Sequence, residues 1–228
     1  MQRNRRAIAF IVIIIGLFAS ILISQEMWQP QIAPTPAAQS ATGSAADLLA
    51  TIPIKGRAPK TGYTRTQFGN GWATINGCDT RNIILHRDMQ QVAVGDGCKV
   101  ESGVLNDPYT GNTITFKRGA DSSADVQIDH VVALSDSWQK GAQQLTADRR
   151  KQLANDPLEL LAVDGPTNQA KGDGDAATWL PPNKLFRCQY VARQIAVKSK
   201  YNLWMTQAEH DAITSILSNC PGQILPSA

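Results

Sequence analysis

The amino-terminal segment limits the fold of this chain more than any other feature. Residues 7–23 form an apolar run of 17 residues without a charge, preceded by three arginines. A basic flank followed by an apolar run indicates an export signal, and this length is near the lower limit for a membrane span. We therefore expect residues 1–24 to be a cleaved signal peptide or a retained membrane anchor, with a slight preference for the anchor. The rest of the chain is then secreted or tethered outside the cytoplasm.

A second segment, residues 25–60, is rich in Pro, Ala, Ser and Thr and lacks a sustained apolar period. This composition predicts a flexible linker. Residues 61–228 remain for the folded part, and they suffice for one domain with a hydrophobic core.

Four cysteines, all in the predicted exported domain, restrict the fold further. An even number of cysteines outside the cytoplasm indicates two disulfides. Three pairings exist, and we favour Cys78 with Cys98 because the two lie within one local unit. Cys188 with Cys220 is favoured for the same reason. A zinc site is the alternative, but its cysteines usually stand about two residues apart, and this sequence has no such pair.

Overall charge gives no argument for a nucleic-acid partner. The whole chain carries a formal net charge of +3, but residues 61–228 contain 16 Lys and Arg against 17 Asp and Glu. Residues 176–208 contain five basic residues and no acid, namely Lys184, Arg187, Arg193, Lys198 and Lys200. A phosphate-attracting patch and a solvated helix face are equally good interpretations of this cluster.

The residue pattern of the domain predicts an α+β fold. Strands are expected at 113–117, 126–134 and 158–163, and helices at 146–155, 183–198 and 207–219. Thr146 should cap the first of these helices. Thr206 and Glu209 should form a capping box at the last one. A short helix is expected to begin at Thr167, just after a turn at 164–166.

Asp129 and His130 interrupt an otherwise apolar segment. Burying two ionisable groups is costly unless a metal ion, a phosphate or another partner compensates. Neighbouring residues on a strand point to opposite faces, so a shared site requires the strand to bend or end at His130. Taken alone, a hydrogen-bonded core histidine is the commoner explanation. The strand and short helix downstream can bring Asn168 to the same point, and Asp and Asn oxygens suit a hard cation such as Mg²⁺.

Several segments together resemble a nuclease family. They are Ile128–Leu134, Asn155–Leu158, Asn168–Asp173 and Trp179–Pro182, together with Cys78–Asn82. In combination they resemble the exported bacterial HNH endonucleases, which are related to the C-terminal domain of GmrSD-type restriction enzymes. The resemblance covers roughly residues 62–220. It implies a ββα-metal core, also called the HNH or His-Me finger, with additional helices and N-terminal strands.

The resemblance also implies roles for single residues. His130 matches the general base, and Asn155 matches the Asn that braces the loop and orients this base. Asp129 and Asn168 match the two protein ligands of the metal. Lys171 is placed to contact the scissile or an adjacent phosphate.

Three further residues carry less specific expectations. Arg81 and Arg118 are candidates for phosphate contacts, with structural salt bridges as the equal alternative. Glu159 stands where the family pattern would have Asn, and its carboxylate either lies at the surface or perturbs the site. The tryptophans, Trp72 included, are expected in the core rather than as platforms for bases.

The expected activity is hydrolysis of nucleic-acid phosphodiester bonds, with DNA favoured over RNA. One divalent cation would assist, Mg²⁺ first and Mn²⁺ or Ca²⁺ as alternatives, while neutral His130 removes a proton from water. The membrane would be a partner only through a retained residue 1–24 segment, and no protein partner is indicated. The main alternative is a non-catalytic, disulfide-stapled binding module. A cell-wall hydrolase would need a zinc-binding histidine set, and the three histidines do not have its spacing.

Overall fold

A computed structural model of the chain describes residues 44–120 and 122–226. The predicted signal or anchor and most of the predicted linker lie outside these residues. Among the helices that are described, none combines the length and the hydrophobicity that a membrane crossing requires. The last part of the predicted linker, residues 44–60, belongs to the folded domain instead. Helix α2 (Ser44–Leu49) buries Ala45 and Leu49 against helices further along the chain.

The domain mixes helices and strands, as the sequence predicts. The longer helices are α3 (Thr80–Asp88), α4 (Leu134–Gln139), α5 (Ala147–Ala154), α6 (Gly165–Lys171), α7 (Arg187–Lys200) and α8 (Gln207–Leu217). The strands are β1 (Thr74–Ile75), β2 (Cys78–Asp79), β3 (Met89–Val94), β4 (Val100–Asn106), β5 (Thr113–Lys117), β6 (Val126–His130) and β7 (Leu160–Asp164). Short 3-10 helices are η1 (Arg65–Phe68), η2 (Asp96–Cys98), η3 (Ala142–Gln144) and η4 (Lys184–Phe186).

Strands β6 and β7 form an antiparallel pair that separates two hydrophobic cores. Residues at alternate positions face opposite sides, and the register pairs Ile128 with Ala162 and Asp129 with Leu161. Ile128 and Ala162 belong to a core shared with α3 and the antiparallel sheet β3-β4-β5. Leu161 belongs to the other core, which is built mainly from helices. The β6–β7 pair therefore has little contact with water, and polar side chains on it need partners.

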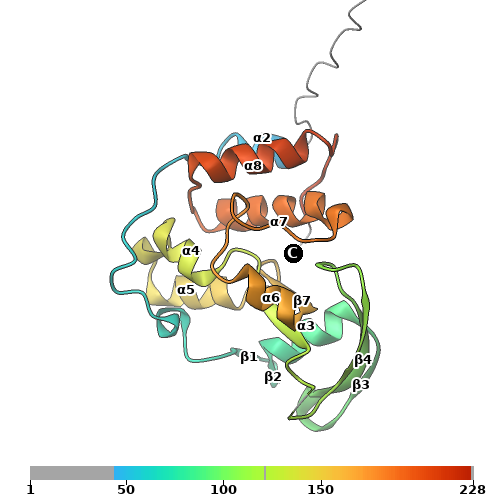
Figure 1. Ribbon diagram of the computed structural model, residues 1–228. Helices are drawn as coiled ribbons and strands as arrows, with labels where there is room; N and C mark the ends of the chain where they lie inside the picture. The colour runs from blue at the N-terminus through green and yellow to red at the C-terminus, as the bar shows by residue number, and fades with distance from the viewer. Residues whose placement is uncertain (1–43, 121, 227–228) are drawn as a thin grey trace, which may run out of the picture. The chain divides into compact units, whose positions relative to one another are not determined.

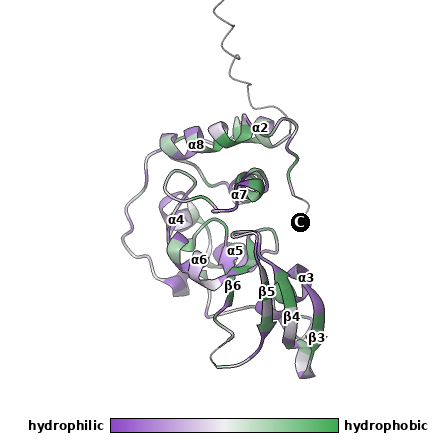
Figure 2. Ribbon diagram, turned by 45° about the vertical axis from the view of Figure 1, so that its right-hand side comes forward, coloured by the Kyte–Doolittle hydropathy of each residue, from purple (hydrophilic) through white to green (hydrophobic). Residues whose placement is uncertain are grey.

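The helical part of the domain lies on the other side of this pair. Helix α7 packs against both α2 and α8, and Figure 1 shows α2 and α8 running together above it. Figure 2 shows hydrophobic residues on α7 and on the strands of the β3-β4-β5 sheet, whereas α5 is mostly hydrophilic. Helix α6 follows β7 directly and packs against both β6 and β7.

Capping side chains begin α5 and α8 as predicted. Thr146 accepts a hydrogen bond from the backbone of Arg149 at α5, and Thr206 does the same at α8. The prediction that Thr167 caps α6 was wrong. The carboxylate of Asp164 caps this helix and accepts a hydrogen bond from the backbone amide of Thr167 at 2.8 Å. The carboxylate of Glu209 does not complete a capping box, because it forms buried ion pairs with Lys140 and Lys198.

Both predicted disulfides are confirmed. Cys78 and Cys98 join β2 to η2, with their Cα atoms 5.8 Å apart. Cys188 and Cys220 join the start of α7 to the turn after α8, at a Cα separation of 6.1 Å. No cysteine is free. The two bonds staple one local unit at each end of the domain.

A cluster of six buried or half-buried charges joins α4, α7 and α8. Its members are Arg57, Asp136, Lys140, Asp175, Lys198 and Glu209. The ammonium of Lys140 lies at 2.6–2.8 Å from a carboxylate oxygen of each of the three acids. Lys198 is fully buried here, so the basic residues 184–200 do not form one surface patch. Within that stretch, Lys200 binds Asp156 at 2.6 Å.

Candidate active site at the end of strand β6

The candidate site begins where β6 ends, at His130. Beyond the strand, the Val131 amide still donates to the backbone carbonyl of Glu159 at 2.9 Å. The Val132 amide instead donates to the Glu159 carboxylate at 3.2–3.3 Å. Strand β6 ends at His130, four residues before the end of the predicted strand segment, and this meets the condition that a shared site requires. Ending the strand there allows His130 and Asp129 to share a site although they start from opposite faces.

The imidazole of His130 is buried and oriented by a backbone carbonyl. Its Nε2 lies 3.0 Å from the carbonyl oxygen of Ala154. A carbonyl only accepts hydrogen bonds, so Nε2 carries the proton and Nδ1 of the neutral ring is an acceptor. Burial lowers the pKa of His130 most, and the charges of Arg65 and Lys171 lower it further, whereas the hydrogen bond to the Ala154 carbonyl raises it. The result is a pKa of about 3 instead of 6.5. The ring is therefore neutral at physiological pH.

The indole of Trp72 stacks on His130, with ring centroids 5.7 Å apart and planes 6° from parallel. Asn155 fixes the segment that carries this indole, because its side chain accepts a hydrogen bond from the backbone of Ala73 at 2.8 Å. The Asn155 amide also donates to the carbonyl of Lys151 at 2.9 Å. Asn155 thus braces the loop, as the family pattern implies, but these bonds do not reach the imidazole itself. Orientation of His130 comes from the carbonyl before Asn155 and from Trp72.

The carboxylate of Asp129 is buried and has two hydrogen-bond donors. The ammonium of Lys171 lies 2.8 Å from Oδ1, and the hydroxyl of Tyr109 donates to Oδ2. Lys171 also donates to the carbonyl of His130 at 2.8 Å. The sequence predicted a phosphate contact for Lys171, whereas the structure buries this side chain and directs it inward. Its charge compensates the carboxylate, which removes most of the cost of burying Asp129.

Asn168 lies on α6 and reaches the same place. Its amide nitrogen donates to the side chain of Gln127 at 2.9 Å, which leaves the amide oxygen as an acceptor for a further partner. Asn168, Asp129 and His130 line one cavity of about 140 Å³. Tyr63, Arg65 and Asp173 also line it. The structure thus brings together the three residues that the sequence analysis placed around a cation.

The donor set limits what metal this cavity can hold. No group of three or more His, Cys, Asp or Glu side chains suited to a metal ion occurs in the ranges 44–120 and 122–226. The protein oxygens available are those of Asp129 and Asn168, and each Asp129 oxygen has a lone pair left beside its hydrogen bond. A hard cation that keeps several waters fits such a sparse oxygen set. A closed zinc site does not fit it.

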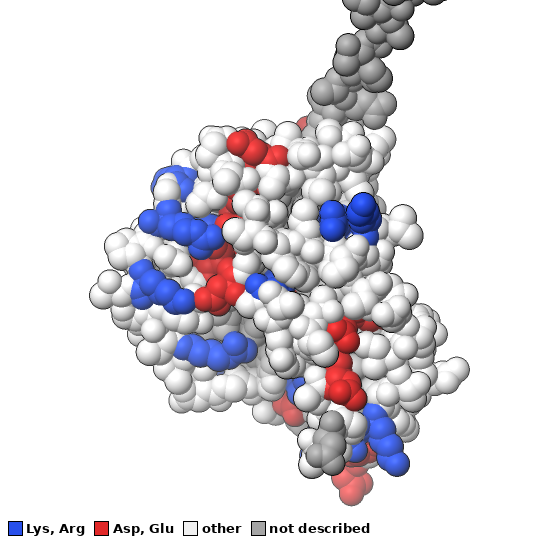
Figure 3. Space-filling view, in the orientation of Figure 1, with Lys and Arg blue, Asp and Glu red and all other residues white. Residues whose placement is uncertain are grey.

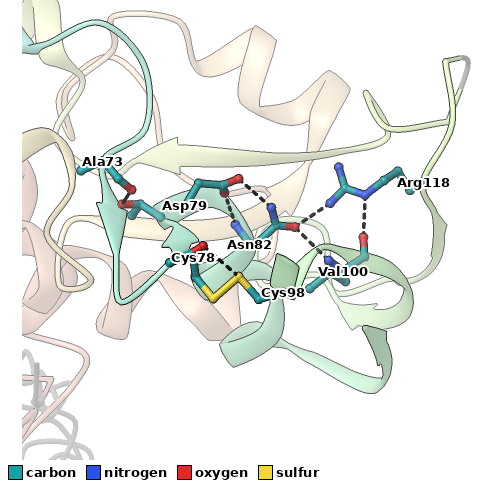
Figure 4. The surroundings of a disulfide bond; sticks show 9 residues. Ala73, Cys78, Asp79, Asn82, Cys98, Val100 and Arg118 are labelled. Atoms are coloured by element: carbon teal, nitrogen blue, oxygen red, sulfur yellow. Dashed lines mark hydrogen bonds between the residues drawn. A yellow bond between two sulfur atoms is a disulfide. The ribbon is translucent and has the colours of Figure 1, made fainter. Parts of the chain in front are cut away.

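The side chains of Arg81 and Arg118, predicted to contact phosphate, bind other parts of the chain instead. The Arg81 guanidinium donates to the carbonyls of Ser123 and Val126 at 3.1–3.2 Å. Arg118 donates to the carbonyl of Val100 and the side chain of Asn82 at 2.6–2.8 Å (Figure 4). Neither arginine lines the cavity at His130. Arg81 supports the backbone at the start of β6, and Arg118 supports the backbone near the first disulfide.

Glu159 does not lie at the surface, since its exposure is 0 %. Burial raises the pKa of its carboxyl well above 4.5, and the hydrogen bond from Val132 only partly offsets this. The side chain therefore holds the turn after His130 in place, although burying its carboxyl disfavours the ionised form. Sequence reasoning also missed Arg65 and Tyr109, because no local pattern marks either residue as a neighbour of His130.

Comparison with known proteins identifies the family. Residues 84–216 match the family model described as "GmrSD restriction endonucleases, C-terminal domain". This chain belongs to that family. The match includes β6, β7 and α6 with Asp129, His130 and Asn168, and the family relationship indicates a nuclease-like function.

A second comparison extends the relationship. A protein of Arthroderma benhamiae (strain ATCC MYA-4681 / CBS 112371), named "Uncharacterized secreted protein", is 40 % identical over 194 residues. The aligned part covers 84 % of this chain and 92 % of that protein. No solved structure matches the chain.

Proposed function

We propose that this chain is an exported endonuclease of the HNH type that hydrolyses phosphodiester bonds in nucleic acid, with DNA as the favoured substrate. The observation that carries the proposal is a neutral, oriented histidine that lines the same cavity as Asp129 and Asn168. The order β6, β7, α6 supports a ββα core. The two disulfides and the secreted relative support export.

His130 is the proposed general base. Its Nε2–H is held by the Ala154 carbonyl, so Nδ1 is left to accept a proton from a water molecule as the water oxygen attacks phosphorus. The bond from phosphorus to the leaving 3′-oxygen breaks, and that oxygen takes a proton from a solvent water, which gives a 5′-phosphate and a 3′-hydroxyl. A phosphate anion in the cavity raises the pKa of the imidazole, because a nearby negative charge favours the protonated ring. The low pKa of the free site therefore does not prevent proton transfer in the complex.

Asp129 and Asn168 are the proposed ligands of one divalent cation, with Mg²⁺ first and Mn²⁺ or Ca²⁺ as alternatives. When bound, such an ion stabilises the negative charge that develops on the phosphoryl oxygens. Lys171 and Tyr109 have a different role: they hold the Asp129 carboxylate in one orientation beside the cavity. Lys171 is thus a positioning residue rather than a phosphate ligand.

A plasmid-nicking assay tests the proposal. The exported chain should convert supercoiled plasmid to nicked circles in Mg²⁺, and EDTA should stop it. His130→Ala should abolish cleavage, while His210→Ala on α8 serves as the matched control and should cleave normally. Undiminished cleavage by His130→Ala would remove the assignment of the base.

The non-catalytic binding module remains the second candidate, because the pairing of Asp129 with Lys171 and Tyr109 satisfies this carboxylate without a metal. It would be favoured if the wild-type chain binds DNA but cleaves neither DNA nor RNA with any of the three cations.

A further inference from the structure

A second cavity, of about 130 Å³, also has His130 in its lining. It is lined by Arg65, Phe68, Gly69, Gly71, Trp72, His130, Leu134 and Ala154. The proposed general base therefore borders two cavities, one with Asp129 and Asn168 and one with several apolar side chains beside Arg65.

The second cavity contains side chains that suit a flat ring. Phe68 and Leu134 are 2 % and 5 % exposed and form buried walls. Trp72 is only partly buried, so part of its indole faces the cavity and solvent. Gly69 and Gly71 have φ values of +104° and +86°, which favour glycine, and they let the chain turn around the opening. Base–aromatic stacking is the interaction such walls offer to nucleic acid.

Arg65 connects the two cavities. This residue is exposed, and it is common to the linings of both hollows. Figure 3 shows several Lys and Arg side chains on the left of the molecule, with a band of Asp and Glu side chains beside them. A guanidinium at this position suits a phosphate group, which it can bind with two hydrogen bonds.

We propose that Arg65 and Trp72 form a subsite for the nucleotide next to the scissile phosphate, and that this nucleotide is unpaired. Arg65 binds the phosphate, and the base enters the cavity between Phe68 and Trp72. The inference rests on the proposed nuclease function and adds the strand class of the substrate.

The geometry favours an unpaired base for a simple reason. A base inside a duplex is stacked on both sides and hydrogen-bonded to its partner, so it must leave the helix before it can enter an enclosed hollow. Leaving costs a few kcal/mol in a duplex and much less in a single strand. The enzyme should therefore cleave single strands, or loops and frayed ends, faster than intact duplex.

A binding measurement tests the subsite independently of cleavage. We would measure fluorescence anisotropy of a fluorescein-labelled 12-residue oligothymidylate with the His130→Ala chain at several salt concentrations. Adding Arg65→Ala should weaken binding about tenfold, as expected for a lost hydrogen bond to a charged group. It should also reduce the slope of log K against log salt by about 0.7, the value for one phosphate contact on a single strand.

Matched variants separate this role from a general loss of charge or fold. Lys117→Ala, which removes an exposed lysine on β5, should change binding much less than Arg65→Ala. Trp72→Ala should weaken binding about tenfold or more, and Trp72→Phe should retain most of it. In the wild-type chain, a labelled single strand should be cut at least about tenfold faster than the same strand annealed to its complement.

The outcomes are distinguishable. If Arg65→Ala binds like Lys117→Ala, or if duplex and single strand are cut equally fast, the subsite is refuted while the nuclease proposal stands. If no nucleic acid is cut but oligothymidylate binding depends on Arg65 and Trp72, the nuclease proposal fails, and these two residues form a binding site for single strands without a catalytic role.

Discussion

Replacing Lys171 by Met should destabilise the domain by about 3–5 kcal/mol, because it leaves the Asp129 carboxylate buried without a counter-ion. The Lys171 side chain is 1 % exposed and that of Asp129 6 %. The ammonium lies 2.8 Å from Oδ1 of Asp129 and 2.8 Å from the carbonyl oxygen of His130. Methionine fills a similar volume but donates no hydrogen bond, so both oxygens lose a partner. Only the hydroxyl of Tyr109 still binds the carboxylate.

The measurement is urea denaturation followed by far-UV circular dichroism, with both disulfides intact and EDTA present. The matched variant combines Lys171→Met with Asp129→Asn. Because Asn carries no charge, this double variant should recover part of the stability that Lys171→Met loses. A loss near about 0–1 kcal/mol, as for an exposed ion pair, would refute the reasoning. A double variant no more stable than Lys171→Met would refute it as well.

The same variant also probes the proposed cation site. Mg²⁺ and the Lys171 ammonium both neutralise Asp129, so Mg²⁺ should stabilise Lys171→Met more than wild type. Binding to the folded state raises the free energy of unfolding according to ligand concentration and affinity. Equal Mg²⁺ effects on the two proteins would argue against Asp129 as a ligand.

Three further predictions concern stability. Burial raises the pKa of Glu159 well above 4.5, so the folded state binds a proton there and the free energy of unfolding falls as pH rises from 4.5 toward the folded pKa. Over that window the stability of Glu159→Gln relative to wild type should rise by about 1.4 kcal/mol per pH unit. A pH-independent difference would contradict this. Lys140→Met leaves an excess of buried carboxylates and should cost about 3–5 kcal/mol in urea denaturation, whereas a cost below about 1 kcal/mol would mean that the cluster is solvated. Removing the Cys188–Cys220 bond, which spans 32 residues, by a double Ser replacement should cost about 4 kcal/mol; unchanged thermal denaturation would contradict the pairing.

The sequence by itself determined the local features of the domain. The alternating residues of β5 and the Thr146 cap of α5 both follow from short-range patterns. Both disulfides also followed from local spacing. These features depend on backbone geometry and on residues a few positions apart, which a linear sequence displays directly.

Only the tertiary structure decided which distant groups meet. Lys171 binds Asp129, which lies 42 residues earlier in the sequence. The lysine that we expected to contact the substrate phosphate is therefore an internal counter-ion. Trp72 stacks on His130 although they are far apart in the sequence, and α2 joined the core although its segment reads as a linker. The physical reason is that a charged or aromatic side chain can interact equally well with a substrate, with solvent or with another part of the chain. Packing of the two cores around β6 and β7 fixes which partner lies within reach.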